Sequence, residues 1–241
     1  MTSMLTEFIL YLIKQIGMPY LWGGQHTKLT PENYKAVIAR KESTDENRRK
    51  AEEYCEKMFK QGYEVLYAYD CSGLGCYWLY NLKHLYKCDV NANTMMGRCK
   101  LVTNAPKRGY WVFKLSGNRA THIGYMISDA ELIEAKGRAY GVTRTTFRAK
   151  DWSCWGIPKV FESEIIDPPK PEPVDKYVLV VGGSVNVRTS DSKKGKILFT
   201  AHRGDTFPYI DTAPSGWYCI ETKKGVGYIT SLQRYTRLND E

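Results

Sequence analysis

A cysteine, a histidine and a glutamate occupy positions that suit nucleophilic catalysis. Cys71 stands where a loop gives way to an apolar run that is typical of a helix. A thiol at a helix N-terminus faces the positive end of the helix dipole, which favours the nucleophilic thiolate. His122 and Glu134 lie in consecutive β-like segments at an even spacing, which predicts side chains on one face of a hairpin. The carboxylate would then orient the imidazole as a general base.

One helix and several strands are expected to position these three residues. Residues 71–83 are expected to form the nucleophile helix, and a short helix is expected near residues 93–98. Alternating apolar residues and β-formers predict strands at residues 110–115, 121–127, 131–136 and 141–147. Taken alone, Cys71 is equally consistent with a small buried residue that starts a core helix.

Two further motifs accompany the cysteine motif in a fixed order. Pro-Tyr-Leu-Trp-Gly-Gly occupies residues 19–24, Asp-Cys-Ser-Gly-Leu occupies residues 70–74, and His-Ile-Gly occupies residues 122–124. This order of motifs resembles the NlpC family of papain-like cell-wall cysteine peptidases. The resemblance covers roughly residues 1–160. It implies an α+β fold with a papain-like catalytic domain.

The resemblance also implies roles for individual residues. Cys71 would be the nucleophile and His122 the base, and Glu134 falls at the third position, where the family more often has histidine, asparagine or glutamine. A carboxylate at that position would raise the pKa of the histidine. The implied substrate contacts are Tyr20 beside the thiolate, Trp22, Asp70 and Ser72, the last two for instance through a free amine of the peptide. Asp70 and Ser72 are equally ordinary helix caps.

The composition indicates a folded protein with a basic surface. The chain has 241 residues, is 43% hydrophobic, and carries a formal net charge of +9 that is spread over both halves. This charge favours polyanionic partners such as teichoic acids or an anionic wall. No basic cluster interleaves with stacking aromatics as a nucleic-acid site requires. Because the 7 cysteines form no Cys-x-x-Cys and the 4 histidines no His-Glu-x-x-His, we expect reduced thiols, no metal and no cofactor.

The N-terminal segment predicts a helix rather than a signal peptide. Ser3 is placed to cap this helix, residues 5–16 provide an apolar face, and Gly17 ends it. Glu7 and Lys14 interrupt the apolar run, and no basic segment precedes it. No run of the sequence is long enough to cross a membrane. We therefore expect a cytoplasmic protein that lysis releases, as for a phage endolysin, or a secreted protein whose signal has been trimmed.

Residues 27–66 are expected to form a helical insertion between the first two motifs. Thr30-Pro31 would start a short helix, and Ser43-Thr44-Asp45-Glu46 offers a capping box for a second, amphipathic helix that ends at Gly62. Because the insertion joins two motif segments, we expect it beside the active-site groove. A wall or lid of the cleft and a decorative helical hairpin are equally consistent with this pattern.

A proline-rich linker at residues 167–176 is expected to separate a catalytic domain at residues 1–166 from a second domain at residues 177–241. Short β-like segments in the second domain lie at residues 177–181, 185–188, 197–201, 206–211, 217–221 and 225–230. Its motifs Asn186-Val187-Arg188, Gly204-Asp205, Gly216-Trp217-Tyr218 and Gly227-Tyr228-Ile229 resemble a bacterial SH3-like domain. The resemblance implies a small β-barrel that targets a hydrolase to the wall.

These features predict a peptidoglycan hydrolase that cleaves a stem-peptide amide. The family resemblance implies the γ-D-glutamyl bond to a diamino acid, which is either diaminopimelate or lysine. Two other functions fit the same residues: acyl transfer of the transglutaminase type, and wall binding by an inactive peptidase domain. The intact pair of Cys71 and His122 argues against the inactive protein, and the SH3-like domain favours hydrolysis over both alternatives.

Overall fold

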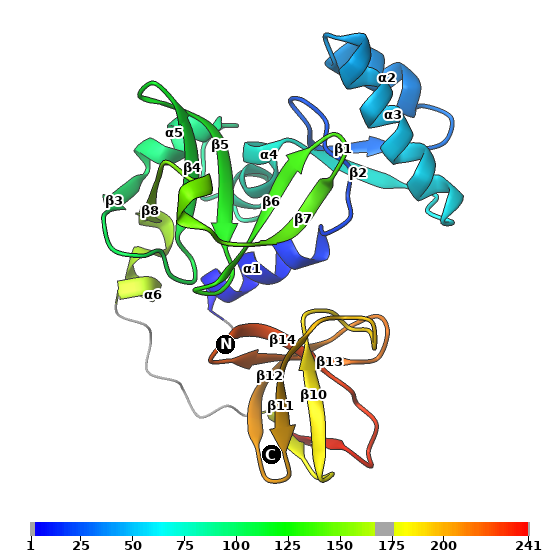
Figure 1. Cartoon of the computed structure of the whole chain (residues 1–241), viewed down its shortest axis with the longest axis vertical. Helices are drawn as coiled ribbons and strands as arrows, with labels where there is room; N and C mark the ends of the chain where they lie inside the picture. Colours follow the sequence, from blue (N-terminus) through cyan, green and yellow to red (C-terminus); the bar gives the residue numbers. More distant parts are fainter. Residues whose placement is uncertain (1–2, 167–175, 241) are drawn as a thin grey trace. The chain divides into compact units, whose positions relative to one another are not determined.

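The structure is a computed structural model that describes residues 3–166 and 176–240 (Figure 1). The chain divides into two compact units, Ser3–Ile166 and a C-terminal unit whose first described residue is Lys176. The expected proline-rich linker, residues 167–176, lies outside the described residues except for Lys176. Each unit has its own sheet and its own hydrophobic core.

The N-terminal unit is built on a six-stranded antiparallel sheet in the order β3-β8-β4-β5-β6-β7. Its strands are β3 (Cys99–Val102), β4 (Trp111–Ser116), β5 (Arg119–Met126), β6 (Glu131–Gly137), β7 (Gly141–Thr146) and β8 (Cys154–Pro158). The four strands expected from the alternation of apolar residues are confirmed with small shifts of their ends. β3 and β8 have no counterpart among the expected elements, because both are short and lack that alternation.

Helix α1 (Met4–Lys14) packs on one face of this sheet, as its apolar stripe predicts. The Ser3 side chain caps the helix by accepting a hydrogen bond from the Thr6 N–H at 3.2 Å. The Phe8 ring lies at the centre of an aromatic cluster whose other members are Trp78, Trp111, Tyr125 and Phe161. Because Trp111 and Tyr125 belong to β4 and β5, this cluster joins the helix to the middle of the sheet.

The expected nucleophile helix begins where predicted but does not continue as a regular α-helix. It consists of α4 (Cys71–Cys76) followed by the π-helix η1 (Tyr77–Leu82). The apolar spacing does not separate these two helix types, so the change was not foreseeable. The short helix expected near residues 93–98 is α5 (Ala92–Gly97). The remaining short helices are η2 (Ala149–Asp151), η3 (Lys159–Phe161) and α6 (Glu162–Ile166).

The insertion contains two helices, as expected, and a two-stranded sheet that was not expected. β1 (Gln25–Leu29) and β2 (Leu66–Tyr69) pair antiparallel, and α2 (Tyr34–Lys41) and α3 (Asp45–Lys60) pack against them. The Thr44 side chain caps α3 by accepting from the Asn47 N–H. The start expected for α2 at Thr30-Pro31 is wrong, because the Asn33 side chain accepts from the Thr30 N–H and holds residues 31–33 as a turn.

The C-terminal unit is all-β, with seven strands in the order β11-β10-β14-β13-β12-β9-β15. These are β9 (Lys176–Val180), β10 (Ser184–Arg188), β11 (Ile197–His202), β12 (Thr206–Thr212), β13 (Tyr218–Thr222), β14 (Gly225–Ile229) and β15 (Thr236–Asp240). All six expected strands are confirmed, and β15 is an addition. Their inward-facing residues form the core of this unit: Val178, Val180, Val187, Ala201, Ile220 and Ile229.

Candidate active site

The first two sequence motifs meet through a close contact between two glycines. A Cβ on Gly73 would lie 2.1 Å from the carbonyl oxygen of Gly24, so only glycine allows this approach. The same Gly24 oxygen accepts a hydrogen bond from the Asp70 N–H at 2.8 Å. The Asp70 carboxylate in turn caps α4 by accepting from the Gly73 N–H at 2.6 Å. These contacts fix Cys71 in the first turn of α4, beside the loop of residues 19–24.

The Cys71 thiol is buried at the start of α4 and lies against the backbone N–H of Ile123. Burial raises the pKa of this thiol to about 11, with a further increase from the Asp70 carboxylate that the nearby backbone N–H groups only partly offset. The expectation that the helix dipole favours a thiolate is therefore wrong for this state. The α4 helix is short, and loss of hydration outweighs its dipole. The thiol needs a base to remove its proton.

His122 and Glu134 lie together on one face of the hairpin, as their spacing predicts. The ladder between β5 and β6 pairs Tyr125 with Ile133, and a hydrogen bond of 2.7 Å joins His122 Nε2 to Glu134 Oε2. Thr145 Oγ1 donates to the other oxygen, Glu134 Oε1, at 3.1 Å. Burial raises the pKa of Glu134, but the bonds from His122 and Thr145 outweigh it and leave the pKa below its ordinary value. A charged acceptor keeps the proton on Nε2 and leaves Nδ1 free as a base.

The Trp152 indole covers the imidazole of His122. The two rings are stacked, with centroids 5.7 Å apart and planes inclined by 19°. A Cβ on Gly124 would lie 2.8 Å from this indole, so the glycine of the His-Ile-Gly motif makes room for it. Trp152 belongs to a buried cluster and also lines a cavity.

The thiol and the imidazole are close in the fold but are not bonded to each other. Cys71 lies against Ile123, the residue that follows His122, and the Tyr125 hydroxyl donates to the Cys71 carbonyl oxygen at 3.0 Å. Both Cys71 and His122 are among the described residues, and no hydrogen bond joins them. Catalytic hydrogen bonds commonly tighten only when the substrate binds.

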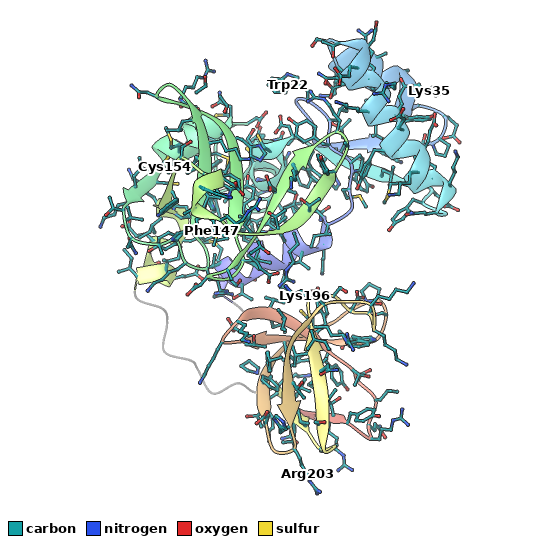
Figure 2. All side chains as sticks on the ribbon, in the orientation of Figure 1. Trp22, Lys35, Phe147, Cys154, Lys196 and Arg203 are labelled. Atoms are coloured by element: carbon teal, nitrogen blue, oxygen red, sulfur yellow. The ribbon has the colours of Figure 1, made fainter. Side chains whose placement is uncertain are left out.

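Tyr20 lies beside Cys71, at the place that the family resemblance implies. Its ring is buried, and burial, followed by the neighbouring thiol, raises the pKa of its hydroxyl. The Arg138 guanidinium lies over this ring, with its Cζ atom 5.0 Å from the ring centroid. Trp22, on the same loop, is 62% exposed and lies at the surface of the N-terminal unit (Figure 2).

A buried carboxylate from the insertion holds this loop. The Glu42 side chain accepts a hydrogen bond from the Trp22 N–H at 2.9 Å through Oε1, and Oε2 accepts from Arg138 Nε at 2.9 Å and Nη2 at 2.7 Å. Lys41 Nζ donates to the Gly23 carbonyl oxygen at 2.7 Å. The insertion is thus bound to the motif loop. An isolated glutamate after a helix carries no pattern that separates it from a solvated one, which is why the sequence did not identify Glu42.

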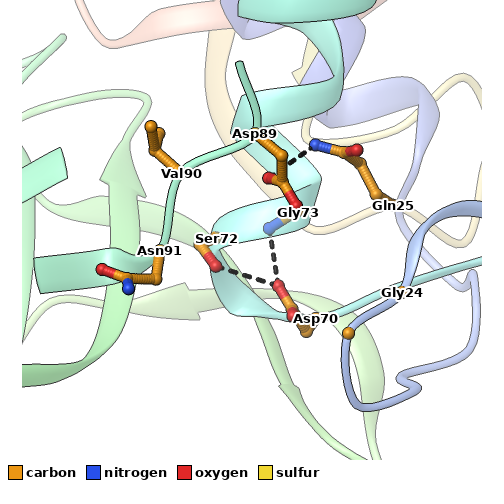
Figure 3. A pocket seen from close by; sticks show the side chains of 9 residues that line it. Gly24, Gln25, Asp70, Ser72, Gly73, Asp89, Val90 and Asn91 are labelled. Atoms are coloured by element: carbon orange, nitrogen blue, oxygen red, sulfur yellow. Dashed lines mark hydrogen bonds between the residues drawn. The ribbon is translucent and has the colours of Figure 1, made fainter. Parts of the chain in front are cut away.

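A polar cavity of about 260 Å³ opens beside the start of α4 (Figure 3). Its lining residues are Gly23, Gly24, Gln25, Asp70, Ser72, Gly73, Asp89, Val90 and Asn91. Ser72 Oγ donates to Asp70 Oδ1 at 3.1 Å, and Gln25 Nε2 donates to Asp89 Oδ1 at 2.9 Å. Burial raises the pKa of Asp70, and the bonds from Gly73 and Ser72 oppose this. Two carboxylates facing a small polar cavity suit a cationic group. The sequence did not indicate Asp89, because its segment has no periodicity.

The other cysteines do not contribute to this site. All seven are free thiols, and Cys55 and Cys76 are buried within helices, as expected for packing residues. Over residues 3–166 and 176–240, no group of His, Cys, Asp or Glu is arranged to hold a metal ion. Within the same described ranges, no helix is long and apolar enough to cross a membrane.

Comparison with known proteins finds different relatives for the two units. Residues 183–235 match the family model of the bacterial SH3 domain. The P60 domain of antigen MAP1204 from M. avium subspecies paratuberculosis is similar to this chain with 18% identity and a TM-score of 0.42, over 66% of this chain and 98% of that domain. No curated protein has significant sequence similarity to the chain.

Two solved structures of peptidoglycan hydrolases are also similar. The NlpC/p60 domain of SagA has 14% identity and a TM-score of 0.41, over 64% of this chain and 98% of that domain. RipB from Mycobacterium tuberculosis has 19% identity and a TM-score of 0.39, over 63% of this chain and 65% of that one. The chain combines a mixed α+β unit that resembles NlpC/P60 domains with an all-β unit that matches the bacterial SH3 domain.

Proposed function

We propose that this protein is a cysteine peptidase that hydrolyses a stem-peptide amide of peptidoglycan. The observation that carries the proposal is the pair of His122 and Glu134, joined by a 2.7 Å hydrogen bond beside a thiol at a helix start. Glu134 orients the imidazole and holds its proton on Nε2, so Nδ1 is the base. This is the arrangement that an amide-cleaving thiol enzyme requires.

The proposed reaction begins with the neutral thiol. His122 Nδ1 takes the proton from Cys71 Sγ as the sulfur attacks the carbonyl carbon, and the carbonyl π electrons move to oxygen. The backbone N–H of Cys71 donates to this oxyanion. The C–N bond then breaks, and His122 gives the proton to the leaving amine. A water molecule next attacks the thioester while His122 takes its proton. The C–S bond then breaks, and His122 gives this proton to Cys71 Sγ, which restores the thiol and the neutral imidazole.

The raised pKa of Cys71 favours this order of events. A thiol with a pKa of about 11 is neutral at pH 7, so it does not form an ion pair with His122 before substrate arrives. Its deprotonation has to accompany substrate binding or attack. The charged Glu134 stabilises the imidazolium that forms at that moment.

The acidic cavity is proposed to hold the acyl part of the substrate. It adjoins Cys71 and exposes the carboxylates of Asp70 and Asp89, which would pair with a free peptide amine. Ser72 orients Asp70 through their 3.1 Å hydrogen bond. Tyr20 and Trp22 are proposed to contact the substrate from the motif loop. The bond that we propose is the γ-D-glutamyl amide to a diamino acid.

The C-terminal unit is proposed to direct the enzyme to the cell wall. It matches the bacterial SH3 domain family over residues 183–235, and the net charge of +9 favours an anionic wall. The protein would therefore act at the bacterial wall, and a role as a phage endolysin that lysis releases is consistent with this. Its partners would be stem peptides and wall polymers rather than nucleic acid.

Digestion of purified peptidoglycan tests the proposal. Walls from several bacteria are incubated with the protein, and the released fragments are identified by mass spectrometry, with Cys71→Ser as the matched control. New amine and carboxyl termini at one stem-peptide bond, absent with Cys71→Ser, are the expected result. Fragments joined to an added amine would instead identify acyl transfer. Binding without any cleavage would identify an inactive wall-binding protein.

A further inference from the structure

A second cavity is lined by Glu134, the hydrogen-bond partner of His122. Its volume is about 390 Å³, and its lining residues include Lys114, Glu134, Lys136, Thr145, Arg148 and Trp152. They come from β4, β6, β7 and the two positions that flank η2. We call this cavity the basic hollow. Glu134 and Trp152 both contact the imidazole of His122, so the hollow adjoins the proposed base directly.

The charges of the basic hollow favour an anion. Three cationic side chains line it, against the carboxylates of Glu134 and Asp151. Both carboxylates are already engaged, since Glu134 binds His122 and Thr145, and Asp151 Oδ2 accepts from Arg148 Nε at 2.8 Å. The Glu134 charge also acts on Lys114, but three cations against two carboxylates leave the hollow with a net positive formal charge.

The lysine ammonium groups lie over aromatic rings. Lys114 Nζ is 5.0 Å from the centroid of Trp152, and Lys136 Nζ is 5.3 Å from that of Tyr140. Such contacts place a cation without neutralising its charge. Lys114 is also the cross-strand partner of His122 in the ladder between β4 and β5, so its side chain projects from the same face of the sheet.

The mechanism defines which end of a substrate would reach this hollow. His122 gives a proton to the leaving amine, so the leaving residue has to lie on the imidazole side of the scissile bond. The acidic cavity includes Asp70 and Ser72, which flank Cys71, and neither His122 nor Glu134. It therefore lies on the acyl side. A substrate that spans the site meets carboxylates on its acyl side and ammonium groups on its leaving side.

We propose that the basic hollow binds a carboxylate at the end of the leaving residue's side chain. The inference rests on the proposed peptidase function and names its substrate class. The α-carboxyl group of a residue within a stem peptide is consumed by the next amide bond, so a free carboxylate there belongs to the side chain. The protein thus selects a dicarboxylic diamino acid of the diaminopimelate type over lysine. Lys114 and Lys136 are the specificity-determining residues.

A pair of synthetic tripeptides tests this proposal. Both have the sequence L-Ala-γ-D-Glu-diaminopimelate with the α-carboxyl group of the last residue amidated, and they differ only in whether the distal carboxylate is free or amidated. The measured quantity is the ratio of kcat/KM for the acid to kcat/KM for the amide. We expect the full-length protein to prefer the acid about tenfold, the effect of one charged hydrogen bond.

Variants that each remove one positive charge then test which residues produce the preference for the acid. Lys136→Gln and Lys114→Gln are each expected to bring the ratio close to one. Lys100 is an exposed lysine on β3, and as the control Lys100→Gln is expected to keep the wild-type ratio. Circular dichroism confirms that each variant is folded. A ratio near one in the wild-type protein, or a preference that survives both lysine variants, overturns the assignment of the basic hollow while the peptidase function stands. Failure to cleave either tripeptide or purified walls overturns the peptidase function, and this inference with it.

Discussion

The guanidinium of Arg138, in the turn that follows β6, donates two hydrogen bonds to one oxygen of Glu42, at 2.9 and 2.7 Å. Glu42 belongs to the insertion, and its side chain is only 1% exposed. The other Glu42 oxygen holds the N–H of Trp22, and the face of the guanidinium lies over Tyr20. One ion pair thus connects the insertion, the first sequence motif and the turn that follows the strand carrying Glu134.

This relationship predicts that Glu42→Gln disturbs both stability and substrate binding. The substitution leaves the Arg138 charge partly buried without its counter-charge, which we expect to lower the free energy of unfolding by about 1–3 kcal/mol. Urea denaturation measures this loss. Glu46→Gln, which removes an exposed pair with Lys50 on α3, serves as the control and is expected to leave the transition midpoint unchanged.

The same variant tests the role of the insertion. If the insertion positions the motif loop, Glu42→Gln raises KM for short muropeptides more than it lowers kcat, because Tyr20 and Trp22 shift while the thiol and imidazole stay in place. A wild-type KM in a folded Glu42→Gln protein would show that the insertion does not contribute to substrate binding. Control of substrate access by residues 27–66 stays a prediction until that measurement is made.

Cys71→Ser is expected to abolish hydrolysis while the fold persists. The substitution removes the sulfur nucleophile and nearly keeps the side-chain volume. Cys55 is the matched control because it is also buried but lies within α3, outside the three motifs and both cavities, so Cys55→Ser should keep wild-type turnover. Turnover by the folded Cys71→Ser protein at the wild-type rate would contradict the assignment of the nucleophile.

Alkylation of Cys71 is expected to show the raised pKa of its thiol. Iodoacetamide reacts with the thiolate, and a group whose pKa is raised to about 11 is protonated below that pH. The rate constant, followed by mass spectrometry of the Cys71 peptide, should therefore rise by about tenfold for each pH unit up to the region of pH 11. A plateau at neutral pH would show instead that the thiolate already exists as an ion pair with His122.

The sequence was sufficient to predict the pairing of His122 with Glu134, because strand periodicity depends only on local spacing. The approach of the first two motifs was expected only from the family resemblance, which implies Tyr20 beside the thiolate. The contact between Gly24 and Gly73 that permits this approach appears only in the fold. Glu42 could not be found in this way. Its partners are distant in sequence, and only the tertiary fold brings Arg138 to it.

The ionisation of Cys71 shows why a local rule failed. The predicted position of Cys71 at a helix start is confirmed, and that position suggested a thiolate. The thiol is nevertheless buried next to the Asp70 carboxylate, and burial depends on the packing of α4 against β5 and the motif loop. A helix of six residues does not compensate for this loss of hydration. The solvent exposure of a site depends on the tertiary fold and not on the local sequence alone.

Loss of the base is expected to be more damaging than loss of its orienting partner. His122→Ala removes the proton acceptor and should reduce kcat by about 10³-fold or more, whereas Glu134→Ala should cost about tenfold to a hundredfold. Glu134→Gln keeps an oxygen acceptor for His122 Nε2, so it should recover part of the rate lost in Glu134→Ala. Wild-type activity of Glu134→Ala would show that another group holds the imidazole.

The lowered pKa of Glu134 also predicts a pH dependence of stability. A carboxylate with a folded-state pKa below its unfolded value of 4.5 adds stability that is fully present above pH 4.5. This stability is lost as the pH falls through the folded-state pKa, because the unfolded chain then binds the proton first. Thermal melts of wild-type protein and Glu134→Gln between pH 3 and pH 7 should therefore diverge least at the acid end. A difference in Tm that grows toward low pH would contradict the lowered pKa.

Removal of residues 167–241 is expected to separate catalysis from targeting. The three motifs, both cavities and the insertion all lie within the unit Ser3–Ile166, which has its own core. The truncated protein should cleave small soluble muropeptides at nearly the wild-type rate, because their binding involves only the N-terminal unit. Its action on intact walls should fall, since the bacterial SH3 domain no longer raises the local concentration of enzyme at the surface. The two rates are compared by chromatography of released peptides and by the clearing of wall suspensions. An equal loss on both substrates would show that the C-terminal unit contributes to the active site itself.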